Sequence, residues 1–183
     1  PCQAARTTVA QFGQHEHVEV RQGSGLKVLS SGEADCIAIA GMGASTIISI
    51  LEDDMDVAQS AKLLVLQPMA GAASLRAWLC SHGWQLAAEE LVDDAPHFYE
   101  IIAAKRGSAP VYSAAEYAVG PLLLAQEHPL LGKQLERQLA TCRQLLENMG
   151  RSERARASEK YKEIEALKAE LEVLQNGKRS DSK

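Results

Sequence analysis

The sequence has few aromatic residues and no paired cysteines, and these shortages restrict both its core and its chemistry. Phe, Trp and Tyr together make up 4% of the 183 residues, so a packed core must be built from Leu, Ala, Val and Ile. The four cysteines form no CxxC pair and the five histidines are not clustered, which argues against a zinc site or a disulfide framework. We therefore expect four reduced thiols and no metal.

Long apolar runs are missing as well. No segment approaches the roughly 20 residues that a helix needs to cross a bilayer, and no charged stretch followed by an apolar one opens the chain. We expect a cytoplasmic protein without membrane contact, present as a monomer or a weak homo-oligomer. The chain begins at Pro1 rather than Met, inside a segment with helical spacing, and this favours a fragment.

Charge is unevenly distributed along the chain. Residues 1–110 contain 7 Lys and Arg against 13 Asp and Glu, whereas residues 111–183 contain 12 against 11. The overall charge of −5 argues against a generic nucleic-acid-binding surface. A polyanion is therefore expected to prefer the second part, although helices with solvated faces normally carry many charges.

Apolar patterning predicts an α/β fold for residues 1–110. Residues 1–12 have helical spacing, and the alternating segment 17–21 predicts a strand. The continuous apolar runs 35–40 and 62–67 predict parallel strands, of which the first is expected to be central and covered on both faces.

Helices and a strand pair complete the first part. Helical segments are predicted at 47–54 and 73–82, each after a buried strand. Strands 84–91 and 97–104 are joined by a connection too short for a crossover helix, so they form an antiparallel hairpin. The order describes an open sheet that ends in an antiparallel pair.

Ligands of such sheets bind beyond the carboxyl ends of the strands. That rule selects three loops, residues 22–26, 40–44 and 67–71, which we expect to lie side by side.

Residues 111–183 are predicted to be helical. A short helix is expected at 121–126, and long ones at 129–149 and 152–175 carry apolar residues at spacings of three and four. Two such stripes separated by Gly150 predict an antiparallel coiled-coil hairpin. Beyond Asn176 the polar tail is expected to be frayed.

Four motifs, in order and followed by the predicted coiled coil, resemble the bacterial tRNA adenine-22 N1-methyltransferases of the TrmK family. They are VRQGSGL (20–26), DCIAIAGMG (35–43), LVLQP (64–68) and YE (99–100). The resemblance covers the chain to about residue 175. It implies a Rossmann-like class I methyltransferase sheet that binds S-adenosylmethionine, with a C-terminal helical hairpin that helps to engage tRNA.

The resemblance also implies what is absent or altered. In that family a first strand and an acidic DIGSDHAYLP-like segment precede the helix with which this chain begins, so this chain alone is expected to bind the cofactor poorly. Ser24 stands where the family usually has Asp, which weakens a hydrogen bond to the adenine amino group. Met69 stands where the family often has Asn, so it can pack against a base but cannot hydrogen-bond its edge.

Candidate cofactor residues follow from the resemblance: Gln22, Gly23, Ser24, Gly25, Ala40, Gly41 and Met42. Gly41, Met42 and Gly43 form the candidate methyl-transfer loop, because glycines permit close backbone approach and carbonyl groups can face developing positive charge. The alternative is that these glycines only make a tight turn between strand and helix. No individual catalytic residue is identified.

Candidate substrate residues lie at two places. Gln67, Pro68, Met69 and Tyr99 are expected near the target base. Met42, Met69 and Tyr99 are candidates to cradle it, although an aromatic residue in a strand is more often part of a core. Arg151, Arg154 and Arg156 open the last helix as a basic cluster that either contacts phosphates or forms a solvated face.

Two other functions remain open. A nicotinamide enzyme is disfavoured, because Thr46 occupies the third glycine position of a dinucleotide motif and no acidic residue ends a clear next strand. A catalytically inactive Rossmann and coiled-coil module that binds RNA or protein is the alternative, supported by the missing first strand and by Ser24.

Overall fold

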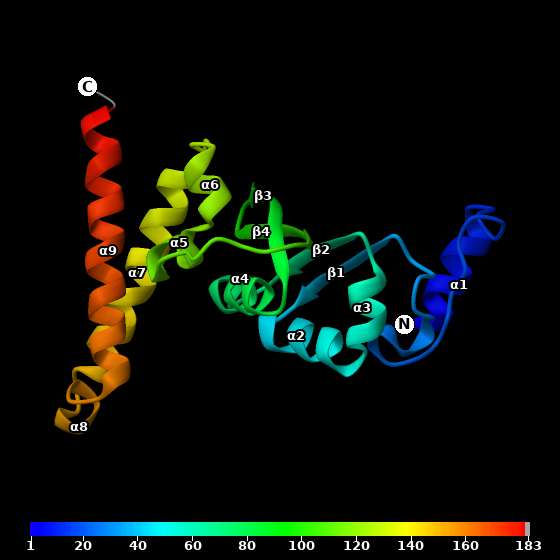
Figure 1. Cartoon of the computed structure of the whole chain (residues 1–183), viewed down its shortest axis with the longest axis horizontal. Coiled ribbons are helices and arrows are strands. Elements are labelled where there is room, and N and C mark those ends of the chain that lie inside the picture. Colours follow the sequence, from blue (N-terminus) through cyan, green and yellow to red (C-terminus); the bar gives the residue numbers. More distant parts are fainter. Residues whose placement is uncertain (182–183) are drawn as a thin grey trace.

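The molecule consists of two groups of elements, a small mixed sheet with its helices and a set of helices that begins at residue 114 (Figure 1). The computed structural model describes the backbone of residues 1–181 and the side chains of residues 1–177. The buried apolar side chains form two clusters, one within the sheet group and one among the helices that also includes Leu91 of the sheet. No helix in the described part of the chain is long and apolar enough to span a bilayer.

The sheet has four strands in the spatial order β1-β2-β4-β3. They are β1 (Cys36–Met42), β2 (Leu63–Pro68), β3 (Trp84–Asp94) and β4 (His97–Arg106). β1 and β2 are parallel, whereas β4 is antiparallel to both β2 and β3. The two predicted parallel strands and the predicted hairpin are therefore confirmed, and each strand extends by one to three residues past its predicted end.

Three helices lie along one face of this sheet (Figure 1). They are α2 (Ala44–Asp53), α3 (Met55–Ser60) and α4 (Ala72–Ser81). Ile47 of α2 and Leu75 of α4 are fully buried in the same cluster as Leu64 of β2. The apolar residues at helical spacing in these segments are thus the side chains that pack on the sheet.

β1 is not the doubly covered central strand that its composition predicts. Among the described residues it pairs with β2 alone, so its other edge has no strand beside it. Ile37 and Ile39 are buried beneath α2, but Cys36, Ala38 and Ala40 are exposed on the opposite face. A continuous apolar run indicates a strand without specifying how many of its sides are covered.

The strand predicted at residues 17–21 does not form. This exposed segment follows α1 (Cys2–Gln11) and has no partner strand among the described residues. A strand exists only when its N–H and C=O groups pair with a neighbour, and without one the extended backbone is hydrated instead. The next regular element is the short 3₁₀ helix η1 (Gly25–Val28).

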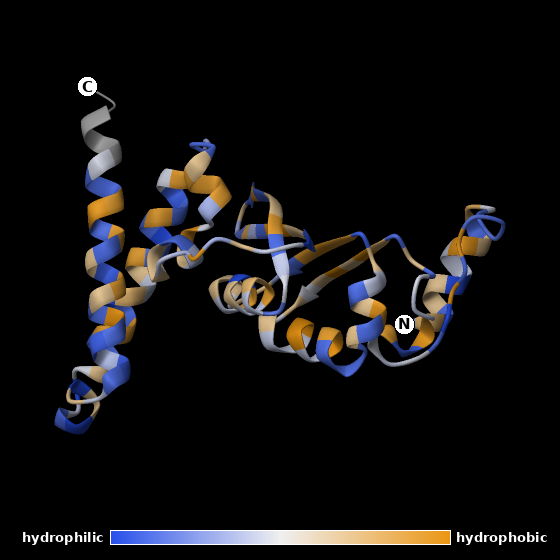
Figure 2. Cartoon of the chain, viewed as in Figure 1, coloured by the Kyte–Doolittle hydropathy of each residue, from blue (hydrophilic) through white to orange (hydrophobic). Residues whose placement is uncertain are grey.

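Within residues 114–181, the described part of the second group, five helices of very different lengths follow one another. They are α5 (Ala114–Val119), α6 (Pro121–Ala125), α7 (Leu131–Met149), α8 (Glu153–Arg156) and α9 (Glu159–Asp181). α7 and α9 run past one another in opposite directions, and Leu135 of α7 and Leu171 of α9 belong to one buried cluster. Polar and apolar residues alternate around both helices in Figure 2.

The predicted helix 152–175 is divided and longer than expected. It breaks at Ala157 and Ser158, where the Ser158 hydroxyl accepts a hydrogen bond from the Tyr161 N–H and caps α9. α9 then continues to Asp181, past Asn176, where fraying was expected. The last two residues of the predicted tail lie outside the described residues.

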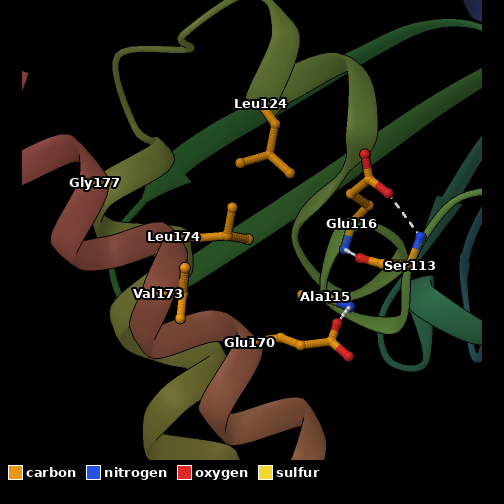
Figure 3. Close-up of a pocket in the computed structure, with 8 residues that line it drawn as sticks. All are labelled: Ser113, Ala115, Glu116, Leu124, Glu170, Val173, Leu174 and Gly177. Carbon is orange, nitrogen blue, oxygen red and sulfur yellow. Dashed lines mark hydrogen bonds between the residues drawn. The ribbon is translucent and has the colours of Figure 1, made fainter.

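α5 lies in the region predicted to be helical, but apolar spacing does not mark it as a separate helix, although its start signal is present in the sequence. The Ser113 hydroxyl accepts from the Glu116 N–H, and the Glu116 carboxylate accepts from the Ser113 N–H, which is a capping box. Glu170 of α9 accepts from the Ala115 N–H at 3.1 Å, beside an apolar hollow formed with Leu124 and Val173 (Figure 3). α9 is thereby attached to the first turn of α5.

A buried ionic network joins the two groups of elements. Arg76 of α4 is fully buried and donates from Nε to Glu89 Oε1 at 2.5 Å and from Nη2 to Glu100 Oε2 at 2.8 Å. Its Nη1 donates to the Tyr117 carbonyl of α5 at 3.0 Å. The other Glu89 oxygen accepts from the Leu122 N–H of α6 at 2.8 Å. One side chain of α4 thus contacts two strands of the sheet and, directly or through Glu89, two helices of the second group.

Glu89 reaches this network because β3 contains a bulge. The pairing of β3 with β4 shifts between Leu86 and Ala88, so the buried positions after Leu86 are Glu89 and Leu91. Without the extra residue the alternation would place Ala88 and Glu90 inward instead.

We expect Arg76→Met to lower the free energy of unfolding by about 3–5 kcal/mol, because Glu89 is left as a buried charge without its cation. Chemical denaturation followed by circular dichroism measures the change. Lys62→Met removes an exposed cation whose partner is Asp35, and it is expected to change stability by less than about 0.5 kcal/mol. Equal, small losses in both variants would contradict a structural role for the network.

Candidate active site

The carboxyl end of β1 contains a second bulge, at Gly41. Ala40 lies opposite Gln67 and Met42 opposite Pro68, so Gly41 is an additional residue that faces no residue of β2. Its φ angle is +77°, a conformation that glycine adopts without strain, and a Cβ atom placed there would meet nothing within 4 Å. The glycine is therefore required by backbone conformation, and the space beside it is open.

Three hydrogen bonds connect this loop to the loop that follows β2. The Gly41 N–H donates to Gln67 Oε1 at 2.9 Å, the Met69 N–H to the Met42 carbonyl at 2.8 Å, and the Ala44 N–H to the Ala70 carbonyl at 2.9 Å. The two loops, predicted to lie side by side, are thus hydrogen-bonded along their length. They form one continuous rim at the carboxyl ends of the parallel strands.

A hollow of about 340 Å³ opens next to this rim, lined by both loops and by the first turns of α2 and α4. Gly71 has a φ of +79°, and a Cβ atom at this position would lie 3.0 Å from the Ala44 side chain. The close approach of the two helix starts therefore depends on glycine. The backbone N–H groups at the two helix starts leave the rim with partial positive charge.

Gln22, Gly23, Ser24 and Gly25 lie beside α2 rather than in the hydrogen-bonded rim. The Cβ position of Gly25 is 3.2 Å from the Ile50 side chain, and Leu26 is buried in the sheet cluster. Ser24 is exposed and its hydroxyl makes no capping hydrogen bond to η1. The third predicted loop therefore borders the same helix, and within the described part of the chain no hydrogen bond links it to the other two.

Arg21 fixes the chain at the entry to this third loop. Its guanidinium donates to the Val28 carbonyl and forms ion pairs with Glu19 and Glu33. The Ser30 N–H and the Arg21 guanidinium hold the pKa of Glu33 below its ordinary value, so this carboxylate stays charged in mildly acidic solution. Residues 21–33 are thus closed into a loop by charge-assisted hydrogen bonds.

The hairpin of β3 and β4 extends from the same edge of the sheet. Leu66 of β2 lies opposite Ile102 of β4, and Tyr99 lies three residues nearer the hairpin turn, opposite Val92 of β3. Met42 and Met69 are 40% and 54% exposed, which is unusual for large apolar side chains, whereas Tyr99 is half-buried. The rim thus presents two flexible thioether side chains to solvent.

The helical group meets the sheet at this hairpin. Lys133 of α7 pairs with Asp93 at 2.5 Å, and the Arg137 guanidinium lies over the Phe98 ring with 4.4 Å between their centres. The His128 imidazole hydrogen-bonds Glu90 and lowers the pKa of that carboxyl group. The start of α7 is therefore held against the tip of the hairpin that leads to Tyr99.

Arg151, Arg154 and Arg156 lie at the opposite end of α7. They are exposed in and next to α8, at the turn between α7 and α9, and the ion pair of Arg151 with Glu147 is long, at 3.7 Å. The 19 residues of α7 span about 28 Å, at the usual rise of 1.5 Å per residue. The basic cluster is thus separated from the hairpin by nearly the full length of a long helix.

Sequence reasoning grouped Gln67 with residues expected to face the substrate, and it missed the contact that this side chain makes. This contact follows from the bulge. The extra residue in β1 has an N–H group with no partner in the neighbouring strand, so a side chain accepts from it instead. No group of three or more potential metal ligands occurs among the residues that the structure describes.

Known proteins match the chain over nearly its whole length. The model of the family described as TrmK: tRNA (adenine(22)-N(1))-methyltransferase matches residues 1–176. The tRNA (adenine(22)-N(1))-methyltransferase of Bacillus subtilis strain 168 is 30% identical over 179 residues, which cover 95% of this chain and 74% of that protein.

Solved structures agree with these matches. The crystal structure of the B. subtilis m1A22 tRNA methyltransferase TrmK has a TM-score of 0.83 at 29% identity, covering 96% of this chain and 77% of that one. A putative tRNA (m1A22) methyltransferase from Streptococcus pneumoniae, solved in complex with S-adenosyl-L-methionine, has a TM-score of 0.78 at 26% identity. That likeness covers 94% of this chain and 75% of the other.

Proposed function

Because this chain belongs to the TrmK family of tRNA (adenine(22)-N(1))-methyltransferases, we propose that it transfers a methyl group from S-adenosylmethionine to N1 of adenine 22 in tRNA. The observation that carries the proposal is the rim at the carboxyl ends of β1 and β2, where the Gly41 bulge is exposed beside open space. The comparisons give no support to the inactive binding module that the sequence left open, and neither they nor the motifs favour a nicotinamide enzyme.

The residues at the rim are compatible with this cofactor. Gly41 and Gly43 leave space in which a side chain would otherwise stand, so a ligand can approach the backbone closely. Ser24 offers a hydroxyl that is not used in capping, which suits a hydrogen bond from an adenine amino group. We assign Gln22, Gly23, Ser24, Gly25, Ala40, Gly41 and Met42 to cofactor binding. S-Adenosylmethionine supplies a methyl group on a positively charged sulfur.

The protein's task in this reaction is alignment. Adenine N1 already carries a lone pair, so the rim needs to orient the two reacting partners in line rather than remove a proton first. The Met42 carbonyl is engaged by the Met69 N–H, and this bond keeps the two loops at a fixed separation. We propose that the exposed carbonyl of Gly41 faces the positive charge as it moves to the base.

The target base must leave its stack to reach this rim, because N1 lies on the edge that base pairs use. We propose that Met42 and Met69 cradle the displaced base, and that Pro68 and Tyr99 form the wall behind them. Polarizable thioethers pack well against aromatic rings, which supports this assignment. Met69 offers no strong hydrogen-bonding group, so base identity must be recognised elsewhere.

We propose a division of labour between residues 1–110, the Rossmann-like catalytic domain, and residues 111–183, an antiparallel coiled-coil domain that helps to hold tRNA. The exposed cluster of Arg151, Arg154 and Arg156 supports phosphate contacts at the distal turn. Exposed large apolar residues are scattered along the chain, which supports a monomer or a weak homo-oligomer. A tRNA substrate supports a cytoplasmic location.

Transfer of tritium from labelled S-adenosylmethionine to a tRNA transcript tests the function. We expect label in a transcript with adenine at position 22 and none in the same transcript with guanine there. Calorimetric titration of the cofactor into this chain, and into a version extended upstream by the strand and loop of the relatives, measures binding separately. Absence of both binding and transfer in both versions would return the inactive module to first place.

We expect Gly41→Val to abolish methyl transfer, with a loss of at least about 100-fold, because a β-branched residue cannot hold the bulge at positive φ without displacing the rim. Gly13→Val is the matched control, since Gly13 has a φ of +63° and open space but lies in the turn after α1. Circular dichroism should show a retained fold in both variants. Normal transfer by Gly41→Val would show that the loop is only a turn.

We expect charge reversal of Arg151, Arg154 and Arg156 to glutamate to weaken tRNA binding and flatten its salt dependence. Each lost phosphate contact reduces the slope of log K against log salt by roughly 0.7–0.9. Reversal of Lys27, Lys62 and Lys105, three exposed cations of the sheet region, changes net charge equally and serves as the control. Equal slopes for the two triple variants would make the distal cluster a solvated face.

A further inference from the structure

The Gly41 N–H is a backbone donor that the strand ladder does not accommodate. The bulge places Gly41 between the pairs Ala40–Gln67 and Met42–Pro68, so no β2 carbonyl stands opposite it. A donor of this kind costs free energy unless another acceptor is supplied or water reaches it. The acceptor here is the side-chain oxygen of Gln67, at 2.9 Å.

Gln67 is well suited to this contact because both ends of the residue are restrained. Its backbone is paired with β1 at Ala40, and its amide oxygen must face Gly41, since only the oxygen can accept from an N–H. The amide nitrogen is then directed at Met69 Sδ, 3.5 Å away. A single side chain thus contacts both loops of the rim.

The other two hydrogen bonds between the loops involve residues that follow Gly41 in the chain. Met69 N–H to Met42 carbonyl and Ala44 N–H to Ala70 carbonyl restrain the residues that follow Gly41, and the strand ladder restrains those before it. The bond to Gln67 acts on the bulge residue itself. It therefore selects the peptide orientation at Gly41, where the backbone has the widest conformational choice.

We propose that Gln67 is a positioning residue for methyl transfer: its amide oxygen holds the Gly41 bulge in the conformation that aligns the reacting groups. The inference rests on the proposed function and assigns Gln67 a role different from substrate recognition. It acts through the backbone of the rim, and its loss is expected to disturb alignment more than binding. A displacement of about 1 Å in such a loop is enough to cost on the order of 100-fold in rate.

The experiment compares Gln67→Met, which keeps length but removes the acceptor, with Gln67→Glu, which keeps an acceptor oxygen. Exposed Gln59 of α3, changed to Met, is the control for the substitution itself. Hydrogen exchange of the Gly41 amide, measured by NMR, reports the contact without any substrate. Initial rates with tRNA give kcat and KM, and calorimetry gives the Kd of S-adenosylmethionine.

In Gln67→Met the Gly41 amide should exchange roughly 2- to 10-fold faster, as expected for loss of one ordinary hydrogen bond. Its kcat should fall by about 10- to 100-fold, with KM for tRNA and Kd for the cofactor changing by less than about threefold. Gln67→Glu should restore Gly41 protection and most of kcat, and Gln59→Met should match wild type.

Two results would overturn the positioning role: an unchanged kcat in Gln67→Met despite faster Gly41 exchange, or a rise in KM alone, which would indicate direct substrate recognition. Failure of Gln67→Glu to restore Gly41 protection would also count against it. Failure of methyl transfer to tRNA by the wild-type sequence, both as this chain and in the version extended upstream, would overturn the proposed function itself, and this result is visible before any variant is compared.

Discussion

The fold depends on a guanidinium group that is removed from water between the sheet and the helices. Arg76 satisfies two carboxylates from neighbouring strands and a carbonyl of α5, and Glu89 passes the connection on to α6. Burying these charges costs free energy that their mutual attraction largely offsets, so the network contributes specificity more than stability when it is complete. Its hydrogen bonds are directional, so they favour one orientation of the helices on the sheet. Apolar contacts alone are compatible with several orientations.

This constraint explains why the distal helices have a defined relation to the rim. The start of α7 rests on the hairpin through Lys133 and Arg137, and the hairpin is paired with β2, whose carboxyl end forms half of the rim. Each contact in this series is local. Together these contacts link the rim at Gly41, through β2, the hairpin and α7, to the turn at α8. The buried ionic network lies near the middle of this series.

The sequence predicted the regular elements well, and it failed where tertiary pairing decides the outcome. Apolar runs identified β1, β2 and the hairpin, because burial of a strand leaves a direct compositional trace. Residues 17–21 have the same alternation but form no strand, since alternation does not reveal whether a partner is present. Two single-residue bulges were invisible for a similar reason: they are properties of a pair of strands. One of them turns Glu89 inward, and the other gives Gln67 its contact with Gly41.

The straight run of α7 has a geometric consequence for substrate selection. Its 19 residues set the distance between the hairpin and the basic turn, and under the proposed contacts a tRNA that reaches both must match that length. A helix adds about 1.5 Å and 100° per residue, so inserting one residue would swing the distal arginines to another face. Inserting seven would restore their direction to within about 20° while moving them about 10 Å outward. Under the proposed tRNA contacts, the phase of this helix as well as its charge would set which part of a folded RNA faces the rim.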